Sequence, residues 1–273
     1  MKGKTILSVL RNVFAWALSL IMFVPFALIL VNSLKDRVQA NTMSIKLPTE
    51  LHWSNYAVVI EEGKLISSFF NSLLYAVAST LLSVALASVA AYIFSRNATR
   101  LNRAMYFFLI MGIAMPVNYV TLTKVMQWTQ LINTQIGIIV LLSVMAIPFS
   151  VFLIYGFVGT VPRELDEAGI VDGCSPFRLF GSIAIPLLTP VLVTVCILNF
   201  MNCWSDFVLP LYYLNNSDKW PMTLAVYNFF GRFQVNWNLV SADIVLTTLP
   251  VILIYLLGQK YIISGMTSGS VKG

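Results

Sequence analysis

The chain has 273 residues and a mass of 30.4 kDa; 58% of its residues are hydrophobic and only 10% are charged. Soluble domains carry about 25% charged residues, so the composition excludes a soluble enzyme, a DNA-binding protein and a disordered scaffold. It predicts an all-α, polytopic membrane protein, in which the distribution of charge says more than the net charge of +6. The single histidine, His52, also excludes His-based triads and multi-histidine metal sites.

Apolar stretches without charges predict where the chain crosses the membrane, since a spanning helix needs about 20 such residues. Six are long enough, and in chain order they cover 12–34, 71–94, 104–123, 136–159, 186–205 and 240–257. The weaker stretch from Phe207 to Phe230 is interrupted by polar residues and Pro221, so we expect a loop with short interfacial helices. The sequence therefore predicts six transmembrane helices in one domain that covers residues 1–273.

Basic residues predict the orientation of these spans. The segments before the first span and between the second and third contain basic residues and no acid: Lys2, Lys4, Arg11, Arg96, Arg100 and Arg103. Short loops rich in lysine and arginine stay on the cytoplasmic side. Both termini are therefore predicted to be cytoplasmic, and so is the connection over 160–182.

This connection contains a predicted short helix. Pro162 fits the first helical position, Glu164 and Asp166 complement the positive end of the helix dipole, and Gly173 is placed to end the helix. One face at helical spacing is flat and flanked by acids, and consists of Leu165, Ala168, Gly169 and Asp172. Because about ten residues form a helix only marginally alone, we expect a partner surface to hold it.

The connection resembles the EAA loop of ABC importer permeases. The family pattern is Glu-Ala-Ala-x-x-Asp-Gly-Ala followed by Ile-x-Leu-Pro, and this chain has Glu167-Ala168-Gly169-x-x-Asp172-Gly173-Cys174, eight further residues, and Ile183-x-Ile185-Pro186. It departs from the pattern at Gly169, Cys174 and Ile185. The resemblance implies a fold like that of a type I ABC importer permease.

Two further motifs are similar to the carbohydrate branch of these permeases, the maltose- and glycerol-phosphate-type importers. One is Trp204-Ser-Asp-Phe207, and the other is the tail Gly265-Met-Thr-Ser-Gly-Ser-Val-Lys-Gly273. The resemblance implies a permease subunit for sugars in a bacterial-type inner membrane. Its implied partners are a second related permease, an ABC ATPase dimer and an extracytoplasmic solute-binding protein.

The sequence contains no Gly-x-x-x-x-Gly-Lys-Ser/Thr, so it predicts that this chain binds no nucleotide through a P-loop. We expect no catalytic residue, cofactor or metal site in this chain, with ATP and Mg bound by the partner ATPase. The resemblance implies that the residues coupling ATP hydrolysis to transport are Glu167, Ala168, Gly169, Asp172 and Gly173.

Two other sets of residues are candidates for function. Asp206 and Asp243 are candidates for the solute path because intramembrane ionisable groups tend to face cavities. Asn202 and Trp204 are further candidates beside Asp206, because sugar sites stack aromatic faces on the rings and bind hydroxyls with amides and carboxylates. The aromatic-rich segment before the last span is a candidate for contact with the solute-binding protein: Tyr227, Phe230, Gln234 and Asn236. Interfacial anchoring is the competing explanation for its aromatic residues.

Three other classes of protein compete with a sugar importer as explanations of the sequence. An ABC importer for amino acids or peptides differs only in the tail and the Trp204 motif. An ion-coupled secondary transporter predicts matching Gly/Pro-broken helices in two halves, which the sequence does not contain. A membrane enzyme needs a cluster of titratable groups, and the acids here are scattered. The identity of the sugar, and the permease that holds its site, stay open.

Overall fold

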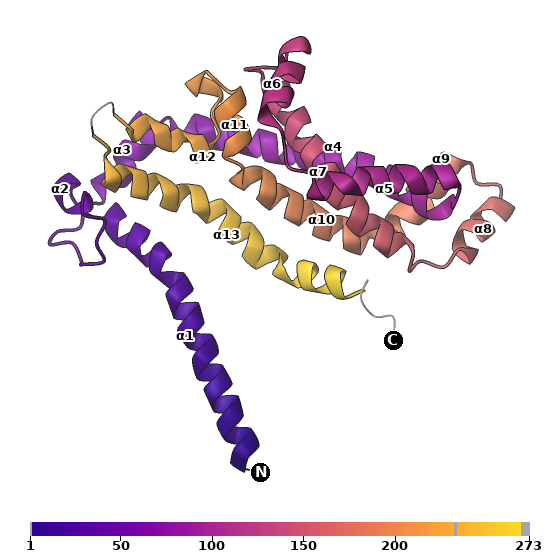
Figure 1. Ribbon diagram of the computed structural model, residues 1–273, viewed down its shortest axis with the longest axis horizontal. Coiled ribbons are helices and arrows are strands. Elements are labelled where there is room, and N and C mark those ends of the chain that lie inside the picture. Colours follow the sequence, from indigo (N-terminus) through magenta and orange to yellow (C-terminus); the bar gives the residue numbers. More distant parts are fainter. Residues whose placement is uncertain (1, 232–233, 269–273) are drawn as a thin grey trace. The chain divides into compact units, whose positions relative to one another are not determined.

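The computed structural model describes residues 2–231 and 234–268 (Figure 1). This part of the chain is helical, and its only strand-like pairing is an isolated bridge between Phe230 and Val235. The all-α prediction is therefore confirmed. The chain divides into two compact units, Met1–Ser67 with Ala225–Leu249, and Ser68–Leu224 with Pro250–Gly273. The prediction of a single domain stays a prediction, and each unit is described by itself.

The first unit combines two segments of the chain, Met1–Ser67 and Ala225–Leu249. Its elements are α1 (Lys2–Ser33), α2 (Arg37–Ala40), α3 (Ser54–Glu62), η3 (Val226–Phe229) and the first part of α13 (Trp237–Ser268). The apolar span of α1, Leu10–Ser33, has none of its most apolar window buried, and Trp16 is 72% exposed. Such a surface is suited to lipid or to another membrane protein.

Asn55 on α3 organises the polar part of this unit. Its Nδ2 donates to the carbonyl oxygens of Ser33 (2.8 Å) and Lys35 (2.9 Å), and its Oδ1 accepts from Nδ2 of Asn238 (2.9 Å). These bonds connect the end of α1 to α3 and to the start of α13. Lys35 is only 1% exposed, and burial lowers the pKa of its ammonium group.

The second unit holds most of the helices. Its elements are α4 (Leu65–Arg96, from Ser68 onward), α5 (Arg100–Ala114), α6 (Tyr119–Trp128), α7 (Gln135–Val158), α8 (Glu164–Val171), α9 (Pro176–Arg178), the π-helical turn η1 (Leu179–Ala184), α10 (Ile185–Ser205), α11 (Val208–Tyr213), η2 (Ser217–Lys219), α12 (Met222–Ala225, up to Leu224) and the second part of α13. The elements between 207 and 230 are short, as the sequence predicts.

The core of the second unit lies where α4, α7 and α10 run side by side (Figure 1). It consists of small and branched apolar residues: Val84, Ala87, Ala91, Val151, Ile154, Val158, Leu188, Val191 and Val195. Nearby, Nδ2 of the buried Asn199 donates to Oγ of Ser83 (3.0 Å) and Oγ of Ser150 (2.8 Å). One amide therefore joins all three helices, as polar side chains do between membrane helices.

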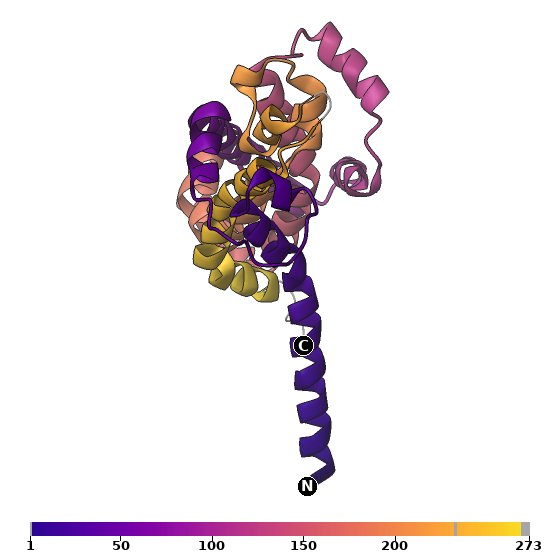
Figure 2. The same cartoon turned by 90° about the vertical axis from the view of Figure 1, so that its left-hand side faces the viewer.

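The third predicted span is wrong as a single helix. Residues 104–123 fall on two helices, α5 and α6, whose axes differ by 116°, and Figure 2 shows α6 turned away from α5. Pro116 disfavours helical geometry at Met115, and Oδ1 of Asn118 caps the new helix by accepting from the Thr121 N–H (3.1 Å). In the described part of the chain, five helices are long and apolar enough to span a membrane, or six if this bent pair is counted as one span.

The fifth predicted span begins earlier than residue 186. A continuous apolar helical stretch runs over Pro176–Ser205, and its first turn is capped by Ser175, whose Oγ accepts from the N–H of Arg178 (3.4 Å). Ser before Pro is a favourable helix start because proline has no N–H to leave unpaired. The connection 160–182 is thus partly an extension of this span. α4 and α13 also extend beyond the predicted 71–94 and 240–257.

Candidate functional site

α8, in the connection between α7 and α10, carries the Glu-Ala-Gly motif. Acids occupy its first turn, where they complement the helix dipole: Glu164, Asp166 and Glu167. The helix begins at Glu164, two residues after Pro162, so the predicted start is wrong. Pro162 lies before the N-cap residue Arg163, whose carbonyl oxygen accepts the first helical bond from the N–H of Glu167 (3.1 Å).

The end of α8 is a left-handed glycine turn. Gly173 has φ of +75°, and its N–H bonds to the carbonyl of Ile170 at 3.0 Å. The N–H of Cys174 bonds to the carbonyl of Gly169, also at 3.0 Å. This pair of bonds is a Schellman motif, which stops the helix and satisfies its last carbonyls. The predicted stop at Gly173 is confirmed.

Gly169 packs against its own chain. It is buried, and a Cβ atom at this position would lie 2.6 Å from Cδ1 of Leu179 and 2.8 Å from Cδ1 of Ile183. The sequence predicted that Gly169 admits a partner surface, but the close approach is made by η1. The missing side chain therefore lets α8 lie against the start of the following span.

The other predicted coupling residues face outward. Glu167, Ala168, Asp172 and Gly173 are exposed. Two large apolar side chains of the same connection are also exposed, Val171 at 86% and Phe177 at 90%. An exposed surface that mixes carboxylates with large apolar groups is typical of a protein contact. The coupling role of these residues stays a prediction.

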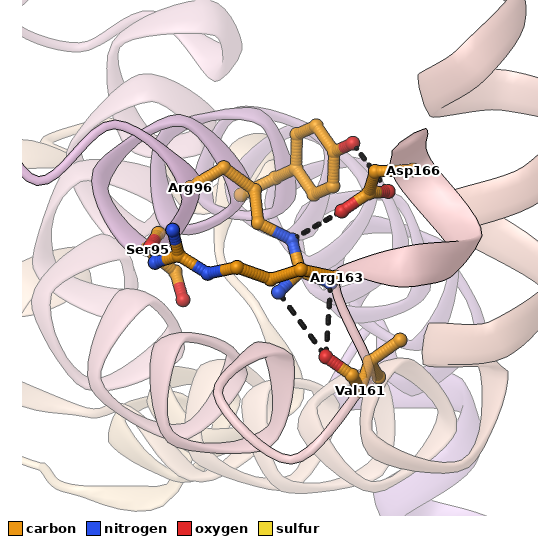
Figure 3. Close-up of polar contacts among 6 residues, drawn as sticks. Ser95, Arg96, Val161, Arg163 and Asp166 are labelled. Carbon is orange, nitrogen blue, oxygen red and sulfur yellow. Dashed lines mark hydrogen bonds and ion pairs between the residues drawn. The ribbon is translucent and has the colours of Figure 1, made fainter. Parts of the chain in front are cut away.

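An ion pair ties the first turn of α8 to the last turn of α4 (Figure 3). Nε of Arg96 lies 2.6 Å from Oδ2 of Asp166, and each side chain is 14% exposed. Both terminal nitrogens of Arg96 donate to the carbonyl of Val161 at 3.1 Å. The hydroxyl of Tyr92 donates to Oδ1 of Asp166 at 2.9 Å, and Nη2 of Arg163 donates to the carbonyl of Ser95 at 3.3 Å. The carboxylate and the guanidinium are thus each held from two sides.

Two predicted path residues meet at a cavity between α7 and α10. Asn202 and Asp206 line a space of about 150 Å³, together with Leu142, Met145, Ala146, Phe149, Asn199 and Cys203. Asp206 also has a structural task, since its Oδ1 accepts from the N–H of Leu209 at the start of α11 (2.9 Å). The cavity is mainly apolar with convergent amide and carboxylate groups, as in sites for small polar ligands.

The other two predicted path residues do not join this cavity. Trp204 is 2% exposed and packs between the rings of Phe69 and Phe200, with centroids 5.7 Å away in each case. The tryptophan is thus part of the unit's interior. Asp243 belongs to the first unit, where it is 1% exposed.

The predicted receptor-contact residues lie around the isolated bridge of the first unit. Tyr227 (37% exposed) and Phe230 (41%) have ring centroids 5.3 Å apart, and the exposed Gln234 accepts from Nη2 of Arg37. Asn236 is half-buried, and its N–H donates to the carbonyl of Phe229 (3.3 Å). Residues 232–233 of this segment lie outside the described residues, and so does the end of the tail motif, 269–273.

Sequence reasoning missed three side chains that the structure places at these sites. In the sequence, Arg96 is only one of the basic residues that predict the orientation, and no pattern marks Tyr92. Asn199 lines the cavity and bonds to two other helices. An arginine at the very end of a span and an asparagine inside one were the available signals, because buried polar groups in a membrane need partners.

Comparison with known proteins identifies the family. The family model described as "Binding-protein-dependent transport system inner membrane component" matches residues 83–268. The melibiose/raffinose/stachyose import permease MelC of Bacillus subtilis is 33% identical over 254 residues, 92% of each chain. The AmyC permease of Thermoanaerobacterium thermosulfurigenes, from a probable transport system for starch degradation products, is 31% identical over 256 residues, 93% of each chain.

A solved structure has the same fold. It is a crystal structure of a bacterial ABC transporter involved in the import of the acidic polysaccharide alginate, and the match has a TM-score of 0.84. The sequences are 20% identical, and the match covers 96% of this chain and 98% of that one. The fold is therefore that of an ABC transporter permease. With its apolar spans, its EAA-type loop and these matches, the chain belongs to the family of inner membrane components of binding-protein-dependent transport systems.

Proposed function

We propose that the chain is the permease subunit of an ATP-driven importer for sugars or related carbohydrates. The observation that carries this proposal is the likeness, over more than nine-tenths of the chain, to permeases whose names specify the import of melibiose, raffinose and stachyose or the transport of starch degradation products. An amino-acid or peptide importer is not favoured by these relatives, and neither is an ion-coupled secondary transporter.

ATP would be bound and hydrolysed by a separate ATPase dimer that contacts α8. The exposed Glu167, Ala168 and Asp172 supply a surface for this contact, and the large apolar side chains of Val171 and Phe177 extend it. Gly169 and Gly173 act on the fold of this chain. Gly169 lets α8 pack against η1, and Gly173 ends α8 at a fixed place. Coupling of this kind needs an element whose position depends on nucleotide at one end and solute at the other.

The solute path would run along the cavity lined by Asn202 and Asp206 and be completed by a second, related permease. The cavity of about 150 Å³ is smaller than the roughly 300–1,000 Å³ of ligand pockets, which is consistent with a path shared by two chains. The segment around Tyr227, Phe230 and Gln234 would contact an extracytoplasmic sugar-binding protein. Its half-exposed aromatic rings favour such a contact.

Both termini and α8 would lie in the cytoplasm. Cysteine labelling in intact cells tests this orientation in a chain whose three natural cysteines are replaced by serine. Ser175→Cys should react with an impermeant maleimide only after the membrane is opened, whereas Thr42→Cys, its matched exposed control, should react from outside. Labelling of Ser175→Cys in sealed cells would contradict the orientation.

Reconstitution tests the function itself. The chain is placed in proteoliposomes with its partner permease, ATPase and binding protein, and uptake of a radiolabelled oligosaccharide is followed. We expect uptake to require ATP and the binding protein, and unlabelled oligosaccharide but not amino acids to compete. Uptake that follows an ion gradient without ATP would contradict the proposal, and competition by amino acids would favour the other ABC class.

A further inference from the structure

The ends of α4 and α8 are connected by more than the contact of two helices. Arg96 and Tyr92 lie one helical turn apart on α4, and they contact different oxygens of the Asp166 carboxylate, Oδ2 and Oδ1 respectively. The guanidinium of Arg96 also lies over the ring of Tyr92, with its carbon 5.9 Å from the ring centroid. One carboxylate on α8 is therefore held by two side chains of a membrane-spanning helix.

The environment makes this connection strong. Both charged side chains are 14% exposed, and the space beside them, bounded by Val158, Val161 and Leu188, is only about 10 Å³. That volume is about the room of one water molecule, so solvent screens the pair weakly. A paired, half-buried carboxylate loses far more on separation than an exposed one, because it would remain without its partner.

The connection also differs in kind from the rest of the α8 packing. Around Gly169 the contacts are apolar, between α8 and the side chains of Leu179 and Ile183, and apolar contacts allow small sliding movements. At Asp166 the contacts are polar: a charge-assisted hydrogen bond from Tyr92 and a close ion pair with Arg96. When α8 moves, it can therefore slide along η1, but it displaces the end of α4 with it.

We propose that Arg96, Tyr92 and Asp166 form a latch that makes α8 and the cytoplasmic end of α4 move as one body. This inference rests on the proposed function, because a moving ATPase would supply the displacement of α8. The latch residues are positioning residues: they touch neither solute nor nucleotide, and they determine how much of the displacement reaches the membrane. Docking of the ATPase depends on the exposed face of α8, whereas transmission depends on the latch.

The test uses the reconstituted transporter and the single variants Arg96→Met and Asp166→Asn. We expect both variants to keep the ATPase bound. The sugar taken up per ATP hydrolysed should fall about 5-fold or more. The double variant should take up no less sugar per ATP than the more impaired single variant, because the two side chains act through each other. Arg100→Met and Glu164→Gln, exposed charges close by in the chain, are the matched controls and should stay at the wild-type ratio.

Either of two outcomes would overturn the latch in this assay. Loss of the ATPase from the single variants would assign the pair to docking, and an unchanged ratio of sugar to ATP would show that transmission does not use it.

If the wild-type complex itself fails to transport sugar, the proposed function fails instead, and hydrogen exchange on the permease in nanodiscs still tests the latch. Arg96→Met should make the amides of 164–171 exchange about 10-fold faster and leave those of 135–158 unchanged. Unchanged exchange in α8 would contradict the latch.

Discussion

Gly169 lies so close to Leu179 that no side chain fits between them without movement: a Cβ atom would stand 2.6 Å from Cδ1 of the leucine. Ile183 is nearly as close, at 2.8 Å. Both obstructing atoms are the ends of flexible side chains. The position therefore tolerates one added methyl group and no more.

Substitution at Gly169 tests this fit. Gly169→Ala should be close to neutral, because the better helix propensity of alanine, worth up to about 1 kcal/mol, offsets the shift of two side-chain ends. Gly169→Val should destabilise the protein by about 1–3 kcal/mol through overpacking. Thermal unfolding of the purified permease distinguishes the two variants, and Gly169→Val combined with Ile183→Val should recover part of the loss. Equal stability of both single variants would contradict the close packing.

Gly173 should tolerate substitution according to backbone conformation alone. No other atom lies within 4 Å of a Cβ placed there, so the cost of a side chain comes from φ of +75°. Asparagine adopts this conformation readily, whereas a branched residue loses about 1–2 kcal/mol or more. Gly173→Asn should retain uptake and Gly173→Val should lose it while the binding protein still binds sugar. Comparable uptake in the two variants would mean that the turn does not determine the placement of α8.

Asp206 and Trp204 should respond differently to conservative changes. Asp206→Asn keeps the acceptor for the Leu209 N–H but removes a charge from the cavity, so we expect an altered KM for sugar with little loss of stability. Trp204→Phe leaves a void among buried rings and should lower thermal stability by about 1–3 kcal/mol without changing KM. Uptake kinetics and unfolding, measured on both variants, check the assignment. A changed KM for Trp204→Phe alone would return the tryptophan to the solute path.

The segment before α13 offers a test of receptor contact. Replacing Gln234-Val235-Asn236 with Gly-Ser-Gly removes the side-chain amides of Gln234 and Asn236 but keeps the aromatic residues. If the segment contacts the binding protein, stimulation of ATPase activity by that protein should fall while basal activity persists. Leu47→Ser, an exposed site of the same unit (80%), is the control. Normal stimulation of the replaced chain would leave membrane anchoring as the better explanation for the aromatic rings.

Local signals in the sequence are sufficient for the existence of α8 and for its end, though not for its first residue. A glycine after an acid-rich helical segment predicts a left-handed stop, and Gly173 adopts one. The break between α5 and α6 also has local signals, Pro116 and the cap residue Asn118. The continuous hydrophobicity over 104–123 instead favours a single span. Ser175-Pro176 likewise marks the true start of the fifth span. In both cases capping chemistry was a better guide than the length of an apolar stretch.

Long-range relationships could not be predicted in this way. Tyr92 and Asp166 are 74 positions apart, and nothing near either residue indicates the other. The same holds for Asn199, whose partners Ser83 and Ser150 lie on two other helices. For Trp204, an aromatic ring near a span indicates the solute path, whereas packing against Phe69 places the ring in the interior. Side-chain pairing between distant segments depends on how the helices pack, which a single sequence does not state.

In the proposed function, the exposed face of α8 couples a separate ATPase to transport. Glu167 and Glu164 are both exposed acids of the first helical turn, so they form a matched pair with the same effect on the helix dipole. The most direct measurement is the ATPase activity of the reconstituted transporter with and without sugar-loaded binding protein, for Glu167→Ala and Glu164→Ala. We expect Glu167→Ala to lose the stimulation and Glu164→Ala to keep it. Normal stimulation in Glu167→Ala would contradict this coupling.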